Sequence, residues 1–247
     1  MTIPKKRIRP IAAIKALRAL LRDPEDTRQV FLVTDALNGD SGRRNFERFR
    51  RTETGEAVLR ERRVLLDRLC DRDRLSKLPS GTLGRQYYEF MAREGLTADG
   101  LVEASRTKTN DPPSDDVRLF AERIRDWHDL QHVLTGYGRD GLGEVCVLTF
   151  FCAQGWNPGL LLIAIAGMFK VAKEVPGYPI KRAVFEAWRH GRAAAWLTGL
   201  DWEGLLGQQL DTIRPKLAVR TPVIYQRIME RHTAASAGAG ALGVAAE

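Results

Sequence analysis

The chain has 247 residues, 44% of them hydrophobic, which is enough for one large domain with a substantial buried core. Its 39 lysines and arginines outnumber its 31 acidic residues, and the net charge of +8 predicts an anionic partner, either nucleic acid or a phospholipid surface. Nucleic acid is disfavoured because basic and acidic residues alternate in segments 60–63 and 71–74, which is typical of a solvated, salt-bridged helix face. The three cysteines form no CxxC pair, which argues against disulfides and thiolate metal sites.

The N-terminal segment is basic and amphipathic. Residues 1–22 contain no acidic residue, and Ile11, Ile14, Leu17 and Leu21 recur at helical spacing. No uninterrupted apolar run with a small-residue cleavage site follows, so this segment does not have the pattern of a secretory signal. We therefore predict a basic amphipathic N-terminal helix that packs on the domain or touches anionic lipid.

Helical periodicity continues along the chain and alternating β patterns are scarce, so the predicted fold class is mainly α. Turn residues separate the elements at 38–42 and 79–84. In chain order, further helices are predicted over residues 25–37, over 45–75 as one or two helices, and over 114–134, 180–197 and 201–217.

Residues 145–169 contain no charged residue and are long enough in total to cross a bilayer. The run is interrupted at its centre by Gly155, Pro158 and Gly159, which leaves two apolar segments that are each too short to cross alone. We predict a buried helical hairpin, or one that forms an apolar, lipid-binding cavity, rather than a transmembrane helix.

The predicted organisation is a single-domain helical bundle. The N-terminal helix covers residues 1–22, and the helical domain covers 23–217. An additional segment, 218–232, has no assignment. The Ala/Gly/Ser-rich tail, 233–247, is predicted to be disordered.

Two of the four histidines lie within five residues of each other, at His128 and His132. On a helix they stand on the same side, which lets both imidazoles bind one ion. Asp129 is three residues from His132 and can turn its carboxylate to that side. After a glycine-rich turn, Glu144 opens the apolar run and can supply a fourth ligand from a facing helix. The pattern predicts one divalent-metal site.

A plainer interpretation is that His128 and Asp129 cap a helix or form a surface salt bridge, since HxxxH spacings also arise by chance. Glu144 favours the metal, because an acid at the start of a charge-free run is costly to bury without compensation. His190 and His232 lie in polar context and are predicted to be surface histidines.

The pattern of His128, Asp129 and His132, followed after eleven residues by Glu144, resembles the signature of the Coq-four family of ubiquinone (coenzyme Q) biosynthesis proteins. Residues 78–87, LPSGTLGRQY, resemble the block that precedes the metal helix in that family, and residues 202–205 resemble its closing helix. The likeness extends in the same order from about residue 20 to 217. It departs at the C-terminal end, where the family's helical ending is followed here by an additional segment.

The resemblance implies a peripheral membrane protein with a divalent metal, zinc most often, held by His128, Asp129, His132 and Glu144. It implies a lyase that decarboxylates C1 of a polyprenylated 4-hydroxybenzoate, alone or coupled to C1 hydroxylation. If the reaction is oxidative, iron or another redox metal is expected, because zinc is not redox-active.

The partners that the resemblance implies are the polyprenylated ring substrate, the membrane surface, other ubiquinone biosynthesis enzymes and further copies of the chain in a homo-oligomer, with no nucleic acid. The expected location is the cytoplasmic face of the inner membrane in a bacterium, or the mitochondrial inner membrane in a eukaryote.

Two other functions compete with the decarboxylase. The first is a non-catalytic lipid-binding scaffold that organises the pathway enzymes and whose metal only fixes the helices. The second is a metal hydrolase, since the HDxxH pattern differs from HExxH by one residue type; Asp129 is shorter than a glutamate and poorly suited to reach a metal-bound water as a base. An HD-type phosphohydrolase would need a histidine upstream of His128, and the sequence has none.

Overall fold

The computed structural model describes residues 7–23, 26–100, 102 and 114–243. Most of these residues are helical and none belongs to a β-strand, which confirms the mainly α class. The α-helices of this part of the chain are α1 (Pro10–Arg22), α2 (Arg28–Leu37), α3 (Ser41–Phe49), α4 (Glu53–Glu61), α5 (Leu65–Cys70), α6 (Arg72–Ser76), α7 (Leu83–Arg93), α9 (Asp115–Asp126), α10 (His128–Thr135), α11 (Gly141–Gln154), α12 (Pro158–Glu174), α13 (Ile180–Ala193), α14 (Trp202–Leu205), α15 (Leu210–Lys216) and α16 (Val223–Gly243).

Several predicted helices are divided in the structure. The charged stretch 45–75 forms parts of α3 to α6 rather than one or two helices. Thr52 and Asp71 accept backbone hydrogen bonds at the starts of α4 and α6, and Arg62, with φ of 54°, ends α4. Such caps stop a helix even where the apolar spacing continues, which is why periodicity alone joined these elements. The region 201–217 likewise contains two short helices, α14 and α15.

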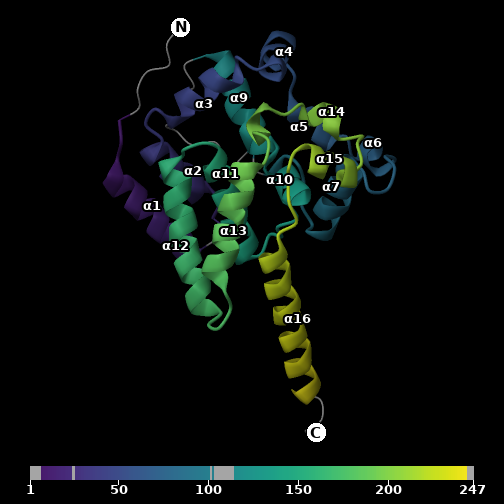
Figure 1. Cartoon of the computed structure of the whole chain (residues 1–247). Helices are drawn as coiled ribbons and strands as arrows, with labels where there is room; N and C mark the ends of the chain where they lie inside the picture. The colour runs from purple at the N-terminus through teal and green to yellow at the C-terminus, as the bar shows by residue number, and fades with distance from the viewer. Residues whose placement is uncertain (1–6, 24–25, 101, 103–113, 244–247) are drawn as a thin grey trace.

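The predicted helical hairpin over residues 145–169 is confirmed as α11 and α12, joined by a short turn. The Asn157 side chain caps α12 by accepting from the Leu160 amide, and Pro158 occupies its first turn. Ten of the fourteen residues of α11 are buried, and α12 and α13 both pack on it (Figure 1). None of the described helices is long and apolar enough to cross a membrane.

The prediction that the hairpin is buried is confirmed for α11 and is wrong for α12, which lies at the surface. Only three of the seventeen residues of α12 are buried, although the helix carries no charge until its last turns. The predicted N-terminal helix is confirmed over residues 10–22 as α1, which packs on α2 and α12 around Leu20, Val33 and Ile163. This leaves Ile165 and Phe169 of α12 exposed.

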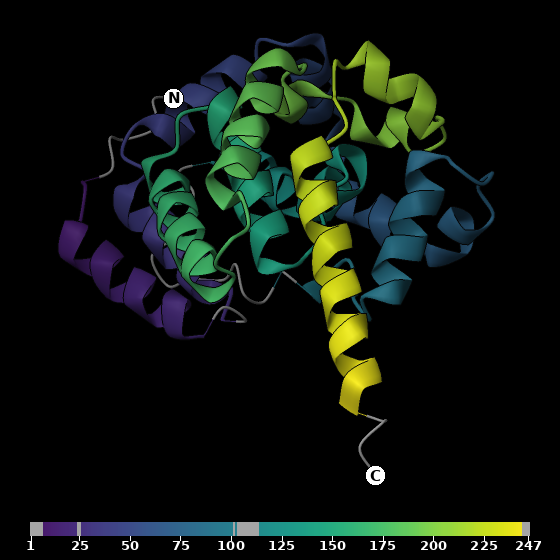
Figure 2. The ribbon, with the colours of Figure 1, turned by 60° about the horizontal axis from the view of Figure 1, so that its bottom comes forward.

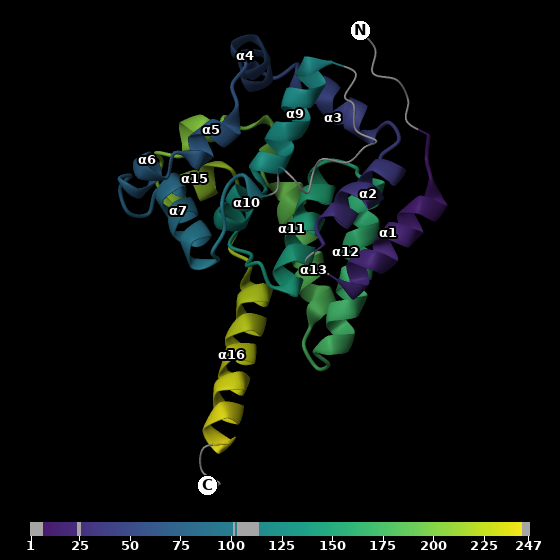
Figure 3. The same cartoon turned by 180° about the vertical axis from the view of Figure 1, so that it is seen from behind.

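The helices gather on two sides of α10. Figures 1 and 3 show α1, α2, α11, α12 and α13 on one side and α5, α6, α7 and α15 on the other. Figure 2 shows α16 extending away from this body. The helix α16 continues to Gly243, into the segment 233–247 that the sequence analysis predicted to be disordered. Alanine has the highest helix propensity, so an Ala-rich segment can extend a helix that has already begun.

Close packing of α13 on α11 depends on Gly191, where an added Cβ would lie 2.4 Å from the Phe150 carbonyl oxygen. We predict that Gly191→Ala lowers the free energy of unfolding by about 2 kcal/mol, because the two backbones must separate. Gly207→Ala is the matched control, since its Cβ meets nothing within 4 Å. Urea denaturation of both variants measures the difference, and equal effects would contradict this account of the packing.

Candidate metal centre

The single helix predicted over this region is divided at Trp127, between α9 and α10. The Trp127 side chain is buried and stacks on Trp202, with ring centroids 5.4 Å apart and an interplanar angle of 16°. Its backbone (φ −86°, ψ 2°) ends α9, and α10 begins at the next residue. His128 and His132 therefore both lie in α10, and their spacing of four places them on one side of it.

All four predicted ligands lie near the His128 ring, but Glu144 lies at the opposite edge from Asp129 and is not part of the group of mutually close donor atoms that the other three form. The His128 and His132 ring centroids lie 4.9 Å apart. Glu144, in the first turn of α11, has Oε1 3.4 Å from Nε2 of His132 and Oε2 3.7 Å from Nε2 of His128. Asp129 lies at the other edge of His128, with Oδ1 3.3 Å from Nδ1. One donor atom from each of His128, Asp129 and His132 lies within 4.8 Å of the others.

The tautomer of His132 is fixed by its surroundings. Its Nδ1 lies 3.1 Å from the Tyr137 carbonyl oxygen, which can only accept, so Nδ1 carries the hydrogen. Nε2 then faces the Glu144 carboxylate, 3.4 Å away. This buried nitrogen makes no hydrogen bond within the described part of the chain. A buried imidazole nitrogen beside a second imidazole and two carboxylates offers the mixture of nitrogen and oxygen donors that zinc binds.

Burial and charge compete at this site. Burial lowers the pKa of His128, but its hydrogen bond with Asp129 and the charge of Glu144 outweigh this effect and raise the pKa above its ordinary value. Burial likewise raises the pKa of Asp129 and Glu144, but the adjacent imidazoles outweigh it and lower both. The two carboxylates are therefore ionised at neutral pH and available to a cation.

Sequence reasoning missed Arg139, which lies in the turn between α10 and α11. Its positive charge adds to the lowering of the pKa of Asp129 and of Glu144, and it opposes protonation of His128. The only signal in the sequence was one basic residue inside the glycine-rich turn that joins the predicted ligands.

Arg214 fixes the C-terminal end of α10. Its Nε and NH2 groups donate to the carbonyl oxygens of Leu134 and Val133, at 2.9 and 3.0 Å. Gly136, with φ of +79°, ends the helix in the left-handed region that favours glycine. These contacts satisfy carbonyl groups at the helix end and help to fix the helix that carries both histidines.

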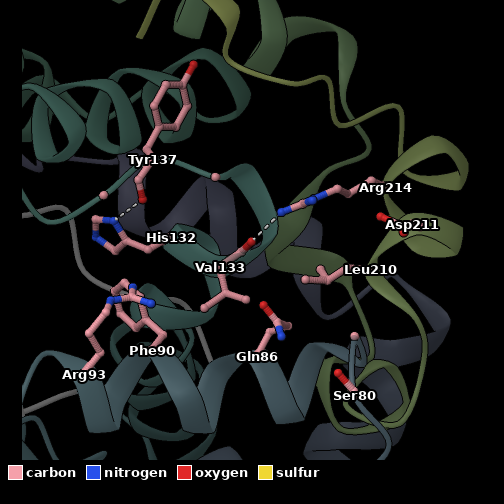
Figure 4. A pocket seen from close by; sticks show the side chains of 13 residues that line it. Ser80, Gln86, Phe90, Arg93, His132, Val133, Tyr137, Leu210, Asp211 and Arg214 are labelled. Atoms are coloured by element: carbon pink, nitrogen blue, oxygen red, sulfur yellow. Dashed lines mark hydrogen bonds between the residues drawn. The ribbon is translucent and has the colours of Figure 1, made fainter. Parts of the chain in front are cut away.

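A cavity of about 390 Å³ lies beside His132 (Figure 4). The Phe90 ring lies nearly parallel to the His132 ring, with centroids 5.9 Å apart, and Val133 and Leu210 add apolar walls while Arg93 adds a charge. Among the described residues that line it, none belongs to α11 or α12. The cavity next to the site is thus formed by α7, α10 and α15, and not by the hairpin that the sequence analysis favoured.

The two remaining histidines lie on other helices. His232 is exposed on α16, as predicted. His190 of α13 is half-buried, and burial lowers its pKa.

The fold and site define a mainly α protein in which two histidines of one helix face a glutamate at the start of a buried hairpin. The chain belongs to the family described as "Coenzyme Q (ubiquinone) biosynthesis protein Coq4", which it matches over residues 5–223.

Curated relatives include the "Ubiquinone biosynthesis protein COQ4 homolog, mitochondrial" of Homo sapiens, 26% identical over 72% of this chain and 66% of its own length. The protein of the same description from Danio rerio is 30% identical over 72% of this chain and 64% of its own. The "Ubiquinone biosynthesis protein COQ4, mitochondrial" of Eremothecium gossypii is 30% identical over 68% and 51%. The chain thus spans between half and two thirds of these relatives.

Among solved structures, a protein from Nostoc punctiforme described as a ubiquinone biosynthesis protein has the same fold. Its TM-score is 0.64 at 24% identity, and the match covers 87% of this chain and 100% of that one.

The raised pKa of His128 sets the pH dependence expected for zinc binding. Because zinc displaces protons from imidazoles, its affinity should rise by about tenfold per pH unit for each displaced proton and level off only above the raised pKa of His128. Glu144→Gln removes one of the charges that raise this pKa, so its weaker binding should level off at a lower pH. Chelator-competition titrations measure both curves, and a pH-independent affinity from about pH 5 to 8 would contradict the assignment.

Proposed function

We propose that this protein is a metal-dependent C1 decarboxylase of a polyprenylated 4-hydroxybenzoate, acting in ubiquinone biosynthesis. Membership of this family supports a role of the chain in ubiquinone biosynthesis. The observation that carries the proposal is the buried Nε2 of His132, which faces the Glu144 carboxylate 3.4 Å away and has no hydrogen bond in the described structure. The proposed ligands are His128, Asp129, His132 and Glu144, with zinc as the ion or iron if the reaction is oxidative.

When bound, the ion would supply a Lewis acid for the ring carboxylate or a ring oxygen. The chain orients the groups around it. The Tyr137 carbonyl holds the Nδ1 edge of His132, so its Nε2 faces Glu144. In this structure Asp129 contacts Nδ1 of His128, and it would have to turn from this contact to bind an ion at the Nε2 atoms as the proposed fourth ligand. Arg139 adds a positive charge beside this centre, and we propose that it attracts the anionic substrate.

The reaction is balanced without a redox partner. A proton adds to C1, the bond between C1 and the carboxyl carbon breaks, its electron pair returns to the ring, and carbon dioxide leaves. The proton comes from water at the open edge of the site, where the side chains of His128 and Glu144 are 30% and 35% exposed. Coupled hydroxylation at C1 would additionally consume dioxygen and two electrons from a reductant, for which a redox metal is needed.

The activity is tested by release of labelled carbon dioxide from the carboxyl group of prenylated 4-hydroxybenzoate by the purified, metal-loaded protein. His128→Ala and Glu144→Ala should each lower the rate at least about 100-fold, because each removes a ligand. His232→Ala, which changes an exposed histidine of α16, should leave the rate unchanged. Arg139→Gln keeps all four ligands and should raise KM.

The competing scaffold function has a distinct outcome in this assay. A protein that binds the prenylated ring tightly, with metal and oxygen supplied, but releases no carbon dioxide would be a lipid-binding scaffold and would contradict the decarboxylase.

We also propose that the chain works at a membrane surface, through the exposed apolar faces of α1 and α12. Ile11 and Ile14 of α1 are 85% and 48% exposed, and Ile165 and Phe169 of α12 are 44% and 56% exposed. Contiguous exposed apolar groups mark an interaction surface. The two helices pack on each other (Figure 1).

The charges around this apolar surface favour anionic lipid. α1 carries Lys15, Arg18 and Arg22 and no acidic residue. Lys181 of α13 lies over the Phe169 ring, 5.6 Å from its centroid. Basic side chains around apolar ones are typical of interfacial binding to anionic headgroups.

The helix α12 packs against the end of α11 that carries Glu144. A Cβ added to Gly167 of α12 would lie 2.7 Å from Cγ2 of Val145, the neighbour of Glu144. A membrane at α12 would therefore lie close to the helix end that carries Glu144, which suits a substrate whose tail remains in the bilayer. We propose the inner membrane of a bacterium, at its cytoplasmic face, or that of a mitochondrion, where other pathway enzymes and a second copy of the chain would be partners.

Binding to vesicles that contain anionic phospholipid tests the surface. Phe169→Ser should weaken binding roughly tenfold, since a buried phenylalanine contributes more than about 1.5 kcal/mol. Val64→Ser is the matched control, because Val64 is also exposed (38%) but lies between α4 and α5. Binding that responds equally to both changes, or a dimer in solution that dissociates in Phe169→Ser, would contradict a lipid-facing surface.

A further inference from the structure

We propose that Tyr225 of α16 is a positioning residue that fixes His132 and Glu144 in their ligand geometry; this inference rests on the proposed metal site. Tyr225 lies in the segment that had no assignment from the sequence and just beyond residues 5–223, which match the family. It is 5% exposed and reaches back from the first turn of α16 into the body.

The Tyr225 hydroxyl makes two hydrogen bonds to the turn between α10 and α11. It accepts from the Gly138 amide at 2.9 Å and donates to Oδ2 of Asp140. Burial raises the pKa of Tyr225, and its hydrogen bond to Asp140 raises it further, so the hydroxyl keeps the hydrogen that it donates. The side chain thus joins both ends of the segment 138–140.

Asp140 transmits this contact to Glu144. Its Oδ1 accepts from the amides of Leu142 and Gly143, at 3.1 and 3.0 Å, and these bonds cap the start of α11. Its carbonyl oxygen accepts from the Glu144 amide at 2.9 Å. The residue that Tyr225 binds therefore fixes the helical turn from which the Glu144 side chain reaches the histidines.

The Tyr225 ring also contacts the residue that supports His132. It packs edge-on against the Tyr137 ring, with centroids 5.3 Å apart and an interplanar angle of 71°. The Tyr137 carbonyl oxygen accepts from Nδ1 of His132 and sets its tautomer. One side chain therefore contacts the supports of both His132 and Glu144.

The turn is tightly closed in the native structure. A Cβ added to Gly143 would lie 2.0 Å from the Gly138 carbonyl oxygen, so the two ends of the turn are in direct contact. Loss of the Tyr225 hydrogen bonds would leave the Gly138 amide and Asp140 without this partner, and the turn should open.

The central test is zinc affinity, measured by chelator competition on Tyr225→Phe. This variant keeps the ring contact with Tyr137 and loses both hydrogen bonds, so we expect roughly tenfold weaker binding, as for other groups that orient metal ligands. Tyr178→Phe is the matched control: its ring lies beside Arg231 and His232 of α16, away from the turn, and the affinity should stay at the wild-type value. Circular dichroism verifies that both variants are folded.

A second readout does not depend on metal. In metal-free protein, Tyr225→Phe should accelerate amide hydrogen exchange in residues 138–144 at least about tenfold and leave α13 unchanged. Asp140→Asn keeps a capping side chain but weakens the acceptor, so its effects should be partial and not additive with Tyr225→Phe.

The outcomes separate the two proposals. Wild-type protein that binds no zinc would contradict the metal site, and hydrogen exchange would still decide whether Tyr225 fixes the turn. Unchanged exchange in Tyr225→Phe would overturn the inference. So would a lower thermal stability with unchanged zinc affinity, because that result assigns Tyr225 a purely structural role.

Discussion

His132 is held between two partners that give its ring nitrogens different roles. The Tyr137 carbonyl oxygen accepts a hydrogen bond from Nδ1, and Nε2 faces the carboxylate of Glu144, which comes from a different helix. The rest of the architecture keeps these groups in register. Trp127 ends α9 so that α10 starts at His128, Arg214 fixes the far end of α10, and the buried helix α11 carries Glu144. Each contact orients a donor atom rather than adding a large share of the folding free energy.

The part of this arrangement that the sequence predicted depends on short-range geometry. The spacing of His128 and His132, and an acid at the start of a charge-free run, are visible without any knowledge of the fold. The hairpin was visible because Gly155 and Pro158 interrupt an apolar run. The helix break at Trp127 was not visible in the sequence, because it depends on stacking with Trp202, which lies 75 positions further along the chain. Periodicity carries no information about such contacts.

The same limit applies to Arg139 and Tyr225. Arg139 looked like one more surface cation, and only the folded turn brings its charge to three of the proposed ligands. Tyr225 lies in the segment 218–232, which had no assignment from the sequence. Its contacts with Gly138 and Asp140 join residues more than eighty positions apart. The sequence analysis expected a cavity at the hairpin. The cavity beside His132 is instead lined by side chains of α7, α10 and α15, which come from distant segments of the chain.

The exposed apolar side chains of α12 and the polar site at the end of α11 lie on helices that pack on each other. The charge-free sequence of the hairpin serves two environments: α11 fills the core, and α12 presents much of its surface outward. Metal content of the purified protein, measured beside carbon dioxide release from prenylated 4-hydroxybenzoate under air and under argon, tests the central claim most directly. We predict about one metal ion per chain and carbon dioxide release that stops when the metal is removed. Full metal occupancy with no release under either gas would contradict it.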